Sequence, residues 1–289
     1  MTTETQQWRI GTTTITSVVE DEVAHIPPEF FFPDATSAAV AAHEWCRPHY
    51  ADADGNIPLR VQALVVETGN RRVLVDPCVG NSKDLASPFW GNQEWPFMER
   101  FAAAGFRVED IDTVVHTHTH PDHVGWDTHI SEGVWVPTFL GARHLYTAEE
   151  LAFARLAADH EQLRHTYRDS IEPIIAAGLA DEVAMDADLG NGLRLEPTPG
   201  HTPGQVALWI ESEGEKALIT GDFIHHPVQC SEPEWAEIGD IDAARARVTR
   251  HRMLQDAAAG GYVVIGTHFP ARPAGRVVTD GQAWRFVPV

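Results

Sequence analysis

Cysteine is scarce in this chain of 289 residues, which holds only Cys46, Cys78 and Cys230. An odd and sparse set of cysteines argues against a disulfide framework and is typical of a reducing compartment. Long apolar runs are also missing, because no stretch approaches the roughly 20 apolar residues that cross a bilayer. The polar segment Met1–Trp8 lacks the apolar core of a secretion signal. We therefore expect a soluble, cytoplasmic protein with no membrane partner.

Positive charge is in short supply as well. The sequence has 21 Lys and Arg residues against 42 Asp and Glu residues, which gives a formal net charge of −21. Such a chain repels phosphate backbones and anionic membrane surfaces, so we expect no nucleic-acid partner. The one run of arginines, at Arg245, Arg247, Arg250 and Arg252, has helical spacing and predicts a solvated helix face.

Regular structure is predicted as two groups of strands with helices between and after them. Strand-like apolar runs occur at Thr13–Glu20, Arg60–Thr68, Arg71–Asp76, Thr113–Val115, Leu193–Glu196, Val206–Ile210, Ala217–Thr220, Tyr262–Ile265 and Arg276–Thr279. Helical patterns occur at Glu94–Ala104, Ala148–Gly178 and Asp242–Ala259. This order is typical of a layered α/β protein, and we expect a single domain over residues 1–289 with a helical insertion at 148–178.

The segment of residues 26–58 differs from the rest, because it is rich in proline and aromatic residues and has little periodicity. A loop of this length inside a compact domain is usually functional or packs against something. Two interpretations stay open: an aromatic substrate lid, or a tucked surface loop or dimer contact.

The densest cluster of metal-binding residue types follows the strand Thr113–Val115. Within six positions the chain carries His118, His120, Asp122 and His123. Imidazole and carboxylate are the ligands that zinc and similar divalent ions prefer. Alternate strand residues face the same side, so His118 and His120 can point together. Pro121 can then start a helix whose first residues aim Asp122 and His123 at a second position, which predicts two metals.

One motif cannot complete two metal sites, and three later strand ends offer further ligands. His201 stands between tight turns in Pro-Gly-His-Thr-Pro-Gly, Asp222 follows the strand Ala217–Thr220, and His268 follows the strand Tyr262–Ile265. Glycine precedes the ligand or lies two residues before it in all three turns, and it permits close backbone approach. Any one of these residues alone is more often an ordinary turn residue, but together they extend the motif.

The ordered set His118-x-His120-x-Asp122-His123, His201, Asp222 and His268 resembles the ligand set of the metallo-β-lactamase superfamily. The resemblance covers about Gln62 to His268 and implies a four-layer αβ/βα sandwich of the α/β class. It assigns His118, His120 and His201 to a first metal, Asp122, His123 and His268 to a second, and Asp222 to a bridging position. Asp76, after the strand Arg71–Asp76, resembles the early aspartate that orients the site in this family; a plain turn former is the alternative.

A two-metal site of this kind hydrolyses its substrate with a metal-bridging hydroxide, since two close ions lower the pKa of a shared water toward neutrality. Asp122 could carry the proton to the leaving group. The three cysteines lie outside the ligand turns, and the chemistry needs no serine or cysteine nucleophile.

Several branches of the family fit the residues poorly. True β-lactamases usually carry cysteine where Asp222 stands. Glyoxalase II needs a helical C-terminal domain with basic residues, and only 21 residues follow His268. Nuclease branches need a phosphate-binding surface, which the net charge of −21 disfavours. Flavodiiron proteins usually have Glu at the position of His120.

The layout is most similar to quorum-quenching lactonases and methyl-parathion-hydrolase-like proteins, with Gly125-Trp126 after the motif and the helical insertion. Aromatic residues could form a pocket for an apolar acyl or aryl group of a small-molecule substrate. They are Phe30, Phe31, Phe32, Trp45, Phe89, Trp90 and Trp126, any of which can equally be core. The lactonases tend to place a tyrosine three residues after the bridging aspartate. This chain has His225 there, either as a substrate-contacting catalytic residue or as a surface residue.

The sequence therefore predicts a hydrolase that cleaves a neutral lactone or carboxylic ester, with Asp122, Asp222 and His225 as candidate catalytic residues. A phosphotriester (organophosphate) or other xenobiotic hydrolase with the same site, and a non-catalytic metal-binding protein, remain alternatives. Five histidines and two carboxylates suit two Zn²⁺ ions best, although Mn, Fe or Co can occupy such sites. A homodimer is expected only by analogy with relatives.

Overall fold

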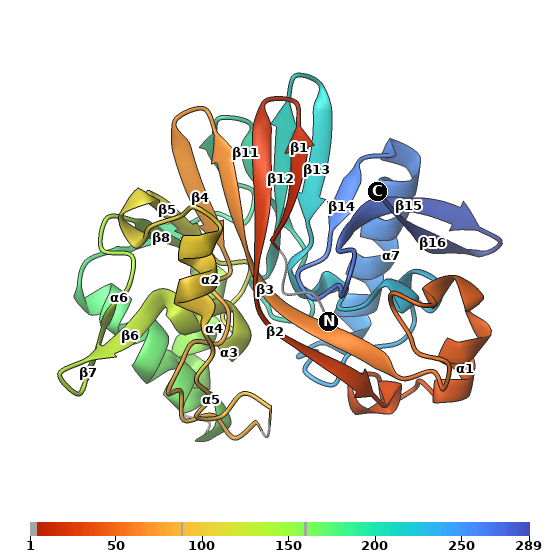
Figure 1. The fold of residues 1–289 in the computed structure, drawn as a ribbon, viewed down its shortest axis with the longest axis horizontal. Coiled ribbons are helices and arrows are strands. Elements are labelled where there is room, and N and C mark those ends of the chain that lie inside the picture. The colour runs from red at the N-terminus through yellow and green to blue at the C-terminus, as the bar shows by residue number, and fades with distance from the viewer. Residues whose placement is uncertain (1–4, 88, 159–160) are drawn as a thin grey trace. The chain divides into compact units, whose positions relative to one another are not determined.

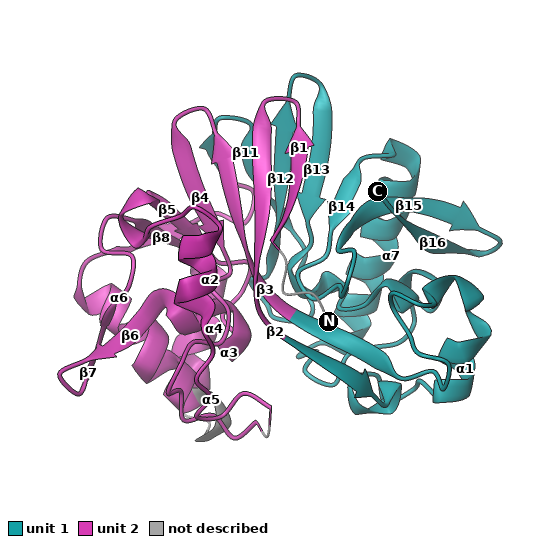
Figure 2. Cartoon of the chain, in the orientation of Figure 1, with its two compact units in different colours: residues 1–2, 22–60, 188–289 teal, residues 3–21, 61–187 magenta. Residues whose placement is uncertain are grey.

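Two long strands, β2 (Thr13–Ile26) and β3 (Ile57–Thr68), pass from one compact unit of the chain to the other (Figure 2). The computed structural model describes residues 5–87, 89–158 and 161–289. Of these, unit 1 contains residues 22–60 and 188–289, and unit 2 contains the remainder. Whether the whole chain acts as a single domain stays a prediction.

The first sheet has seven strands in the order β1-β2-β3-β4-β5-β8-β9 (Figure 1). Its other members are β1 (Gln6–Ile10), β4 (Arg71–Val75), β5 (Thr113–Val115), β8 (Arg143–Thr147) and β9 (Ala180–Val183). Strands β3 and β4 form a hairpin that turns at Gly69, because Thr68 pairs with Arg71. Strands β4, β5, β8 and β9 run parallel, so the residues that follow β4 and β5 meet at one sheet edge.

Short helices accompany this sheet in unit 2 (Figure 1). The α-helices are α2 (Phe97–Ala103), α3 (Pro121–Val124), α4 (Ala148–Ala157), α5 (Glu161–Thr166) and α6 (Glu172–Ala176). The remaining elements are the 3₁₀ turns η3 (Val108–Asp110) and η4 (Gly125–Asp127), the π-helix η5 (Tyr167–Ile171) and the hairpin β6 (Thr128–Ser131) with β7 (Val134–Pro137). Two apolar clusters stabilise the unit: one joins Phe97 and Phe101 to the sheet, and the other joins Leu151 to Ile174.

The second sheet lies in unit 1 and has the order β10-β11-β12-β13-β14-β15-β16. Its strands are β10 (Asp188–Gly190), β11 (Leu193–Pro197), β12 (Val206–Ser212), β13 (Glu215–Ile219), β14 (Val263–Ile265), β15 (Ala274–Asp280) and β16 (Ala283–Pro288). Strands β13 and β14 are parallel and are connected through the 3₁₀ turns η6 (Gly221–Phe223) and η7 (Pro227–Cys230) and the helix α7 (Ala243–Gly260). The Asp242 side chain caps α7, and Gly261 ends it in the left-handed conformation.

Residues 26–58 contain more structure than the sequence indicates: η1 (Pro28–Phe30), α1 (Ser37–Ala42) and η2 (Glu44–Cys46). Phe32 and Tyr50 are buried in the core of unit 1, and the Tyr50 hydroxyl donates to the Arg272 carbonyl at 2.9 Å. These two residues therefore serve as core. The lid and dimer interpretations stay predictions for this segment, in which Phe30 is 46% exposed.

The predicted elements agree with the structure where apolar runs are long, and differ elsewhere. The helix expected from Glu94 begins at Phe97, because Pro96 stands at its N-cap. The helix expected over Ala148–Gly178 is divided into α4, α5, η5 and α6, and its positions 159 and 160 lie outside the described residues. The prediction of a solvated arginine face is wrong for Arg250, which is fully buried. No helix within the described residues combines the length and apolar character of a membrane span.

Candidate metal centre

The structure of unit 2 brings together the four ligands of the first motif. Strand β5 ends at Val115, and Pro121 starts α3, as the spacing predicts. The ring centroid of His118 lies 4.8 Å from that of His120 and 4.0 Å from that of His123. Nε2 of His123 lies 3.6 Å from Oδ2 of Asp122. His118, Asp122 and His123 are buried, and His120 is half-buried.

Asp76 holds this motif from the end of β4. Its Oδ1 accepts from the Thr117 backbone N–H at 2.8 Å, and its Oδ2 accepts from the Thr117 hydroxyl at 2.7 Å. Nδ1 of His123 lies 2.9 Å from the same Oδ2. Asp76 thus contacts the motif at the position that the resemblance implies, and the contact leaves Nε2 of His123 facing Asp122; its role in orienting a metal site stays a prediction.

A second carboxylate supports the motif and was missed by the sequence reasoning. Glu150, in the first turn of α4, accepts from the backbone N–H and the hydroxyl of Thr119 at 3.0 and 2.9 Å. Thr119 lies between His118 and His120, so this buried contact fixes the backbone that carries both rings. Nothing local marks Glu150, which resembles any acidic residue at a helix start.

In unit 1 the structure brings together the later ligands and His225. Oδ2 of Asp222 lies 3.6 Å from Nε2 of His201, 3.2 Å from Nε2 of His268 and 3.1 Å from Nε2 of His225. The His225 and His268 rings stack at 5.8 Å with an interplanar angle of 2°. All four residues are buried, so His225 is not the surface residue of the alternative interpretation.

The His201 and His268 rings are also held at Nδ1, the ring nitrogen that points away from Asp222. Nδ1 of His201 lies 2.9 Å from Oδ1 of Asp240 and 3.8 Å from Oε2 of Glu237. Nδ1 of His268 lies 2.7 Å from the Arg60 carbonyl oxygen. The buried Arg250 explains its own departure from the predicted exposed face, because its guanidinium lies 3.6 Å from Oδ2 of Asp240. Asp240 and Glu237 have no distinguishing sequence pattern and were not predicted.

Burial and the His201 imidazole act in opposite directions on the pKa values of the two carboxyls beside that ring. Burial raises the pKa of Glu237 to about 7, although the charge of His201 lowers it in part. Burial also acts to raise the pKa of Asp240, but the hydrogen bond and charge of His201 outweigh it, and the pKa falls below its usual value. Asp240 is therefore the ionised partner of His201.

Gly200 lets the His201 turn pass close to α7. A Cβ atom at Gly200 would lie 2.3 Å from the backbone nitrogen of Ala246, and its φ is 142°. A side chain at this position would clash with backbone, as the close approach predicted for this turn requires.

The donor sets fit divalent metal ions. Two atoms bound to one zinc at about 2.0–2.2 Å and at the tetrahedral angle lie about 3.4 Å apart. The N···O distances from Asp122 to His123 and from Asp222 to His201 and His268 are 3.6, 3.6 and 3.2 Å. In all three histidines Nδ1 faces an acceptor oxygen, the arrangement that metal-ligating histidines usually have.

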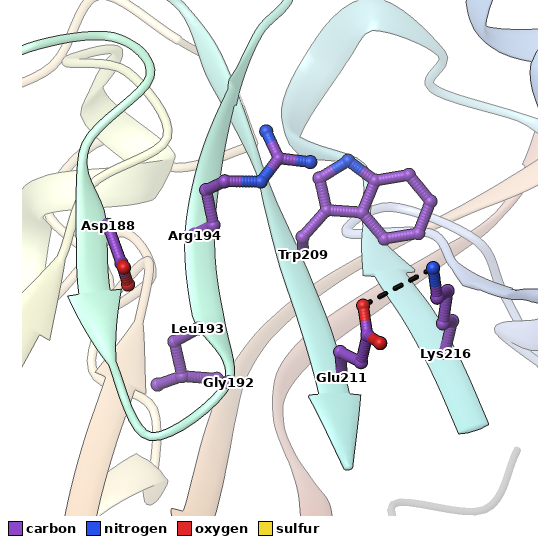
Figure 3. Close-up of a pocket in the computed structure, with 7 residues that line it drawn as sticks. All are labelled: Asp188, Gly192, Leu193, Arg194, Trp209, Glu211 and Lys216. Atoms are coloured by element: carbon purple, nitrogen blue, oxygen red, sulfur yellow. Dashed lines mark ion pairs between the residues drawn. The ribbon is translucent and has the colours of Figure 1, made fainter. Parts of the chain in front are cut away.

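One pocket of the structure borders a predicted metal ligand, and a second pocket does not. A small one in unit 2 borders His120 and is lined by Phe153, Tyr167 and Ile171, among others. A larger one in unit 1, of about 280 Å³, contains Arg194, Trp209 and Lys216, and Lys216 pairs with Glu211 at 3.3 Å (Figure 3). The described lining residues of the larger pocket include none of the predicted ligands.

The sequence profile of the family described as the metallo-beta-lactamase superfamily matches residues 56–268. The chain belongs to the metallo-beta-lactamase superfamily. All seven predicted ligands, from His118 to His268, lie inside the matched range.

Curated relatives match parts of the chain. A probable metallo-hydrolase of Mycobacterium tuberculosis is 29% identical over 185 residues, which cover 59% of this chain and 58% of that protein. A probable metallo-hydrolase of Methanocaldococcus jannaschii is 26% identical over 159 residues, covering 54% of this chain and 64% of that protein. The matches thus span less than two thirds of the relatives' length.

Solved structures resemble the chain over nearly its whole length. The hydrolase AbOPH of the beta lactamase superfamily has a TM-score of 0.82 at 23% identity and covers 100% of this chain and 98% of its own. AidC, described as a dizinc quorum-quenching lactonase in complex with a product, has a TM-score of 0.80 at 20% identity and covers 99% and 97%. The metallo-beta-lactamase fold implied by the sequence resemblance is therefore confirmed.

Proposed function

We propose that this chain is a metal-dependent hydrolase that cleaves a neutral lactone or carboxylic ester. Two divalent ions would be held by His118, His120, Asp122, His123, His201, Asp222 and His268. The observation that carries the proposal is the local convergence of imidazole and carboxylate atoms to 3.2–3.6 Å within each unit, at positions inside the matched family range.

The division of the ligands follows the family resemblance. His118, His120 and His201 would hold one ion, Asp122, His123 and His268 the other, and Asp222 would contact both. Zinc suits five imidazoles and two carboxylates best, and AidC, a structurally similar protein, is described as dizinc. Such a pair of ions, when bound, supplies a Lewis acid for the substrate oxygen and lowers the pKa of water toward neutrality.

The residues of the chain would then orient the substrate and move protons. Asp122 is buried beside His123 and would carry a proton to the leaving oxygen. Nε2 of His225 faces Asp222 at 3.1 Å, and its buried Nδ1 has no hydrogen-bond partner among the residues that the structure describes. We assign that nitrogen to hydrogen-bond the reacting carbonyl or leaving oxygen of the substrate.

The substrate class follows from charge. The net charge of −21 disfavours anionic substrates. The hollow beside His120, lined by Phe153, Tyr167 and Ile171, has a volume of only about 10 Å³ and does not hold an acyl or aryl group as these side chains stand. A structurally similar N-acyl homoserine lactone hydrolase was solved with its product N-hexanoyl-L-homoserine, at 18% identity and a TM-score of 0.60, which supports an acyl lactone as first candidate.

A second candidate is a phosphotriester substrate, which the histidine at position 225 in place of the tyrosine typical of lactonases keeps open. A hydrolysis panel distinguishes the two: an acyl lactone, an aryl ester and a phosphotriester, each with metal-loaded and chelator-treated protein. We expect turnover of the lactone or ester that the chelator abolishes and zinc restores. Turnover of the phosphotriester alone would select the second candidate. Bound metal without turnover of any of the three would favour the non-catalytic metal-binding protein.

A further inference from the structure

A second cluster of buried titratable side chains lies in unit 2, beside the predicted ligands but separate from them. It consists of His116, Asp127, His144 and Tyr146, none of which is more than 2% exposed. His116 directly follows β5, His144 and Tyr146 lie on one face of the neighbouring parallel strand β8, and Asp127 ends η4. The His116 and Tyr146 rings stack with centroids 4.0 Å apart and an interplanar angle of 1°.

The Asp127 carboxylate is the centre of this cluster. Nε2 of His116 lies 3.0 Å from Oδ1 and 2.8 Å from Oδ2, and the Tyr146 hydroxyl donates to Oδ2 at 2.9 Å. Nδ1 of His144 lies 3.0 Å from Oδ1. Burial acts to raise the pKa of Asp127, but His116 and His144 lower it by more, so the pKa lies well below its usual range. The carboxylate is therefore ionised.

His116 is held at both ring nitrogens. Its Nδ1 lies 3.1 Å from the Leu145 carbonyl oxygen of β8, while Nε2 faces the Asp127 carboxylate. The ring therefore joins the end of β5 both to the neighbouring strand and to the end of η4.

The sequence positions of the pair indicate its role. The predicted ligands at 118–123 all lie between His116 and Asp127, so the contact between these two side chains closes the loop that carries them. We propose that the His116–Asp127 pair, braced by His144 and Tyr146, is a clamp that holds this loop in its metal-binding shape. The proposal rests on the proposed function, since it takes the residues at 118–123 as metal ligands. His116 and Asp127 are then positioning residues and do not themselves contact the metal.

The clamp adds to other contacts that hold the loop. Asp76 holds Thr117 and His123 from β4, and Glu150 holds Thr119 from α4. After α3, the backbone N–H groups of Gly125 and Trp126 donate to carbonyls of the segment that follows β4, both at 2.7 Å. The contact of Asp127 with His116 joins the same exit of the loop to the residue that follows β5.

The test is the affinity for zinc and cobalt of Asp127→Asn, measured by competition with a chromophoric chelator. Asparagine keeps the size of the side chain but replaces one of the two carboxylate oxygens that face His116, His144 and Tyr146 by an amide NH₂ group. We expect a loss of affinity of about 10- to 100-fold, the usual effect of removing a partner that orients metal ligands. The cobalt absorption spectrum should change as well, because ligand geometry sets it. Thermal unfolding and circular dichroism of the metal-free variant report whether it folds.

Two further variants make the result interpretable. Tyr146→Phe removes one donor to Asp127 but keeps the stacked ring, so its affinity loss should be much smaller. His116→Gln removes the ring contact to Asp127 from its other side and provides the test if Asp127→Asn does not fold. The double variant should lose no more affinity than either single variant, because each alone opens the clamp.

The outcomes separate this inference from the proposed function. A folded Asp127→Asn protein with the affinity and cobalt spectrum of the original chain would overturn the clamp alone. So would additive losses in the double variant. A third metal per chain that Asp127→Asn removes would make the cluster a metal site and would overturn the clamp too. A chain that binds no divalent metal at all would overturn the proposed function and the clamp together.

Discussion

Replacing Asp76 by asparagine tests how far the geometry of the metal-binding loop depends on a residue outside it. Asp76 accepts three buried hydrogen bonds at 2.7–2.9 Å, two from Thr117 and one from His123. An asparagine at this position would keep the acceptor for the Thr117 backbone N–H but would place an amide group against the other two donors. The Thr117 hydroxyl can turn to accept from this amide, whereas Nδ1 of His123 loses its acceptor.

The expected loss of stability follows from the one hydrogen bond that is lost, between Nδ1 of His123 and Asp76. A hydrogen bond to a charged group contributes about 1.5–3 kcal/mol, and a buried donor without a partner is costly. We therefore expect Asp76→Asn to lower the free energy of unfolding by about 2–3 kcal/mol, or about 4–12 °C in Tm for a chain of this size. Metal affinity should fall by about 10- to 100-fold, because His123 no longer has a fixed orientation.

Asp112→Asn is the matched control. Asp112 also accepts from a backbone N–H, that of Arg72 at 2.7 Å, and from a threonine hydroxyl, that of Thr113 at 2.7 Å. It stands before β5 instead of at the sheet edge with the ligands. The control should lower stability in chemical unfolding but leave the metal affinity unchanged. The reasoning is refuted if folded Asp76→Asn protein binds metal as tightly as the original chain, or if Asp112→Asn loses equal affinity.

Three further outcomes are expected. His225→Phe should lower kcat by about 100-fold without changing metal content, because the substrate loses a hydrogen-bonding group; an unchanged rate would remove His225 from the site. Gly200→Ala should lower the free energy of unfolding by about 2–3 kcal/mol, because a Cβ there meets the backbone of α7 at 2.3 Å. Gly214→Ala, with a φ of 83° and no described atom within 4 Å, is its control and should cost about 1 kcal/mol in calorimetry. Burial lowers the pKa of Lys83 from 10.5 to about 7. The unfolded chain then binds more protons than the folded chain between those values, so stability should rise with pH in this window. Lys83→Met should flatten that rise in urea unfolding between about pH 7 and pH 8.5, and equal slopes in both proteins would contradict the assignment.

The ligand motif was predictable because its determinants are local. An apolar strand at Thr113–Val115, alternation through His118 and His120, and a helix start at Pro121 each have a physical basis within a few residues. The structure reproduces these elements, and Asp76 contacts His123 within the motif.

The supporting residues could not be predicted, because their roles arise from contacts distant in sequence. Asp240 meets His201 across 39 positions, and Glu150 meets Thr119 across 31. Arg250 shows how local reasoning fails: its helical spacing with other arginines predicts an exposed face. Instead, its guanidinium donates to the carbonyls of Phe223, Pro233 and Trp235, contacts that only the tertiary structure provides.

The strands that the sequence did not indicate are short or weakly apolar. Strand β8, Arg143–Thr147, carries arginine, histidine and tyrosine. Its two buried side chains, His144 and Tyr146, both contact Asp127, and Tyr146 also packs in the apolar cluster with Leu151 and Ile174. A polar face inside the protein hides the alternation that identifies a half-buried strand.

Metal content measured on the purified chain and on Asp222→Ala tests the central claim most directly. The account predicts about two divalent ions per chain, and a loss of metal together with chelator-sensitive hydrolysis when Asp222 is replaced. A chain without bound metal, or an Asp222→Ala protein that keeps two ions and full activity, would contradict it.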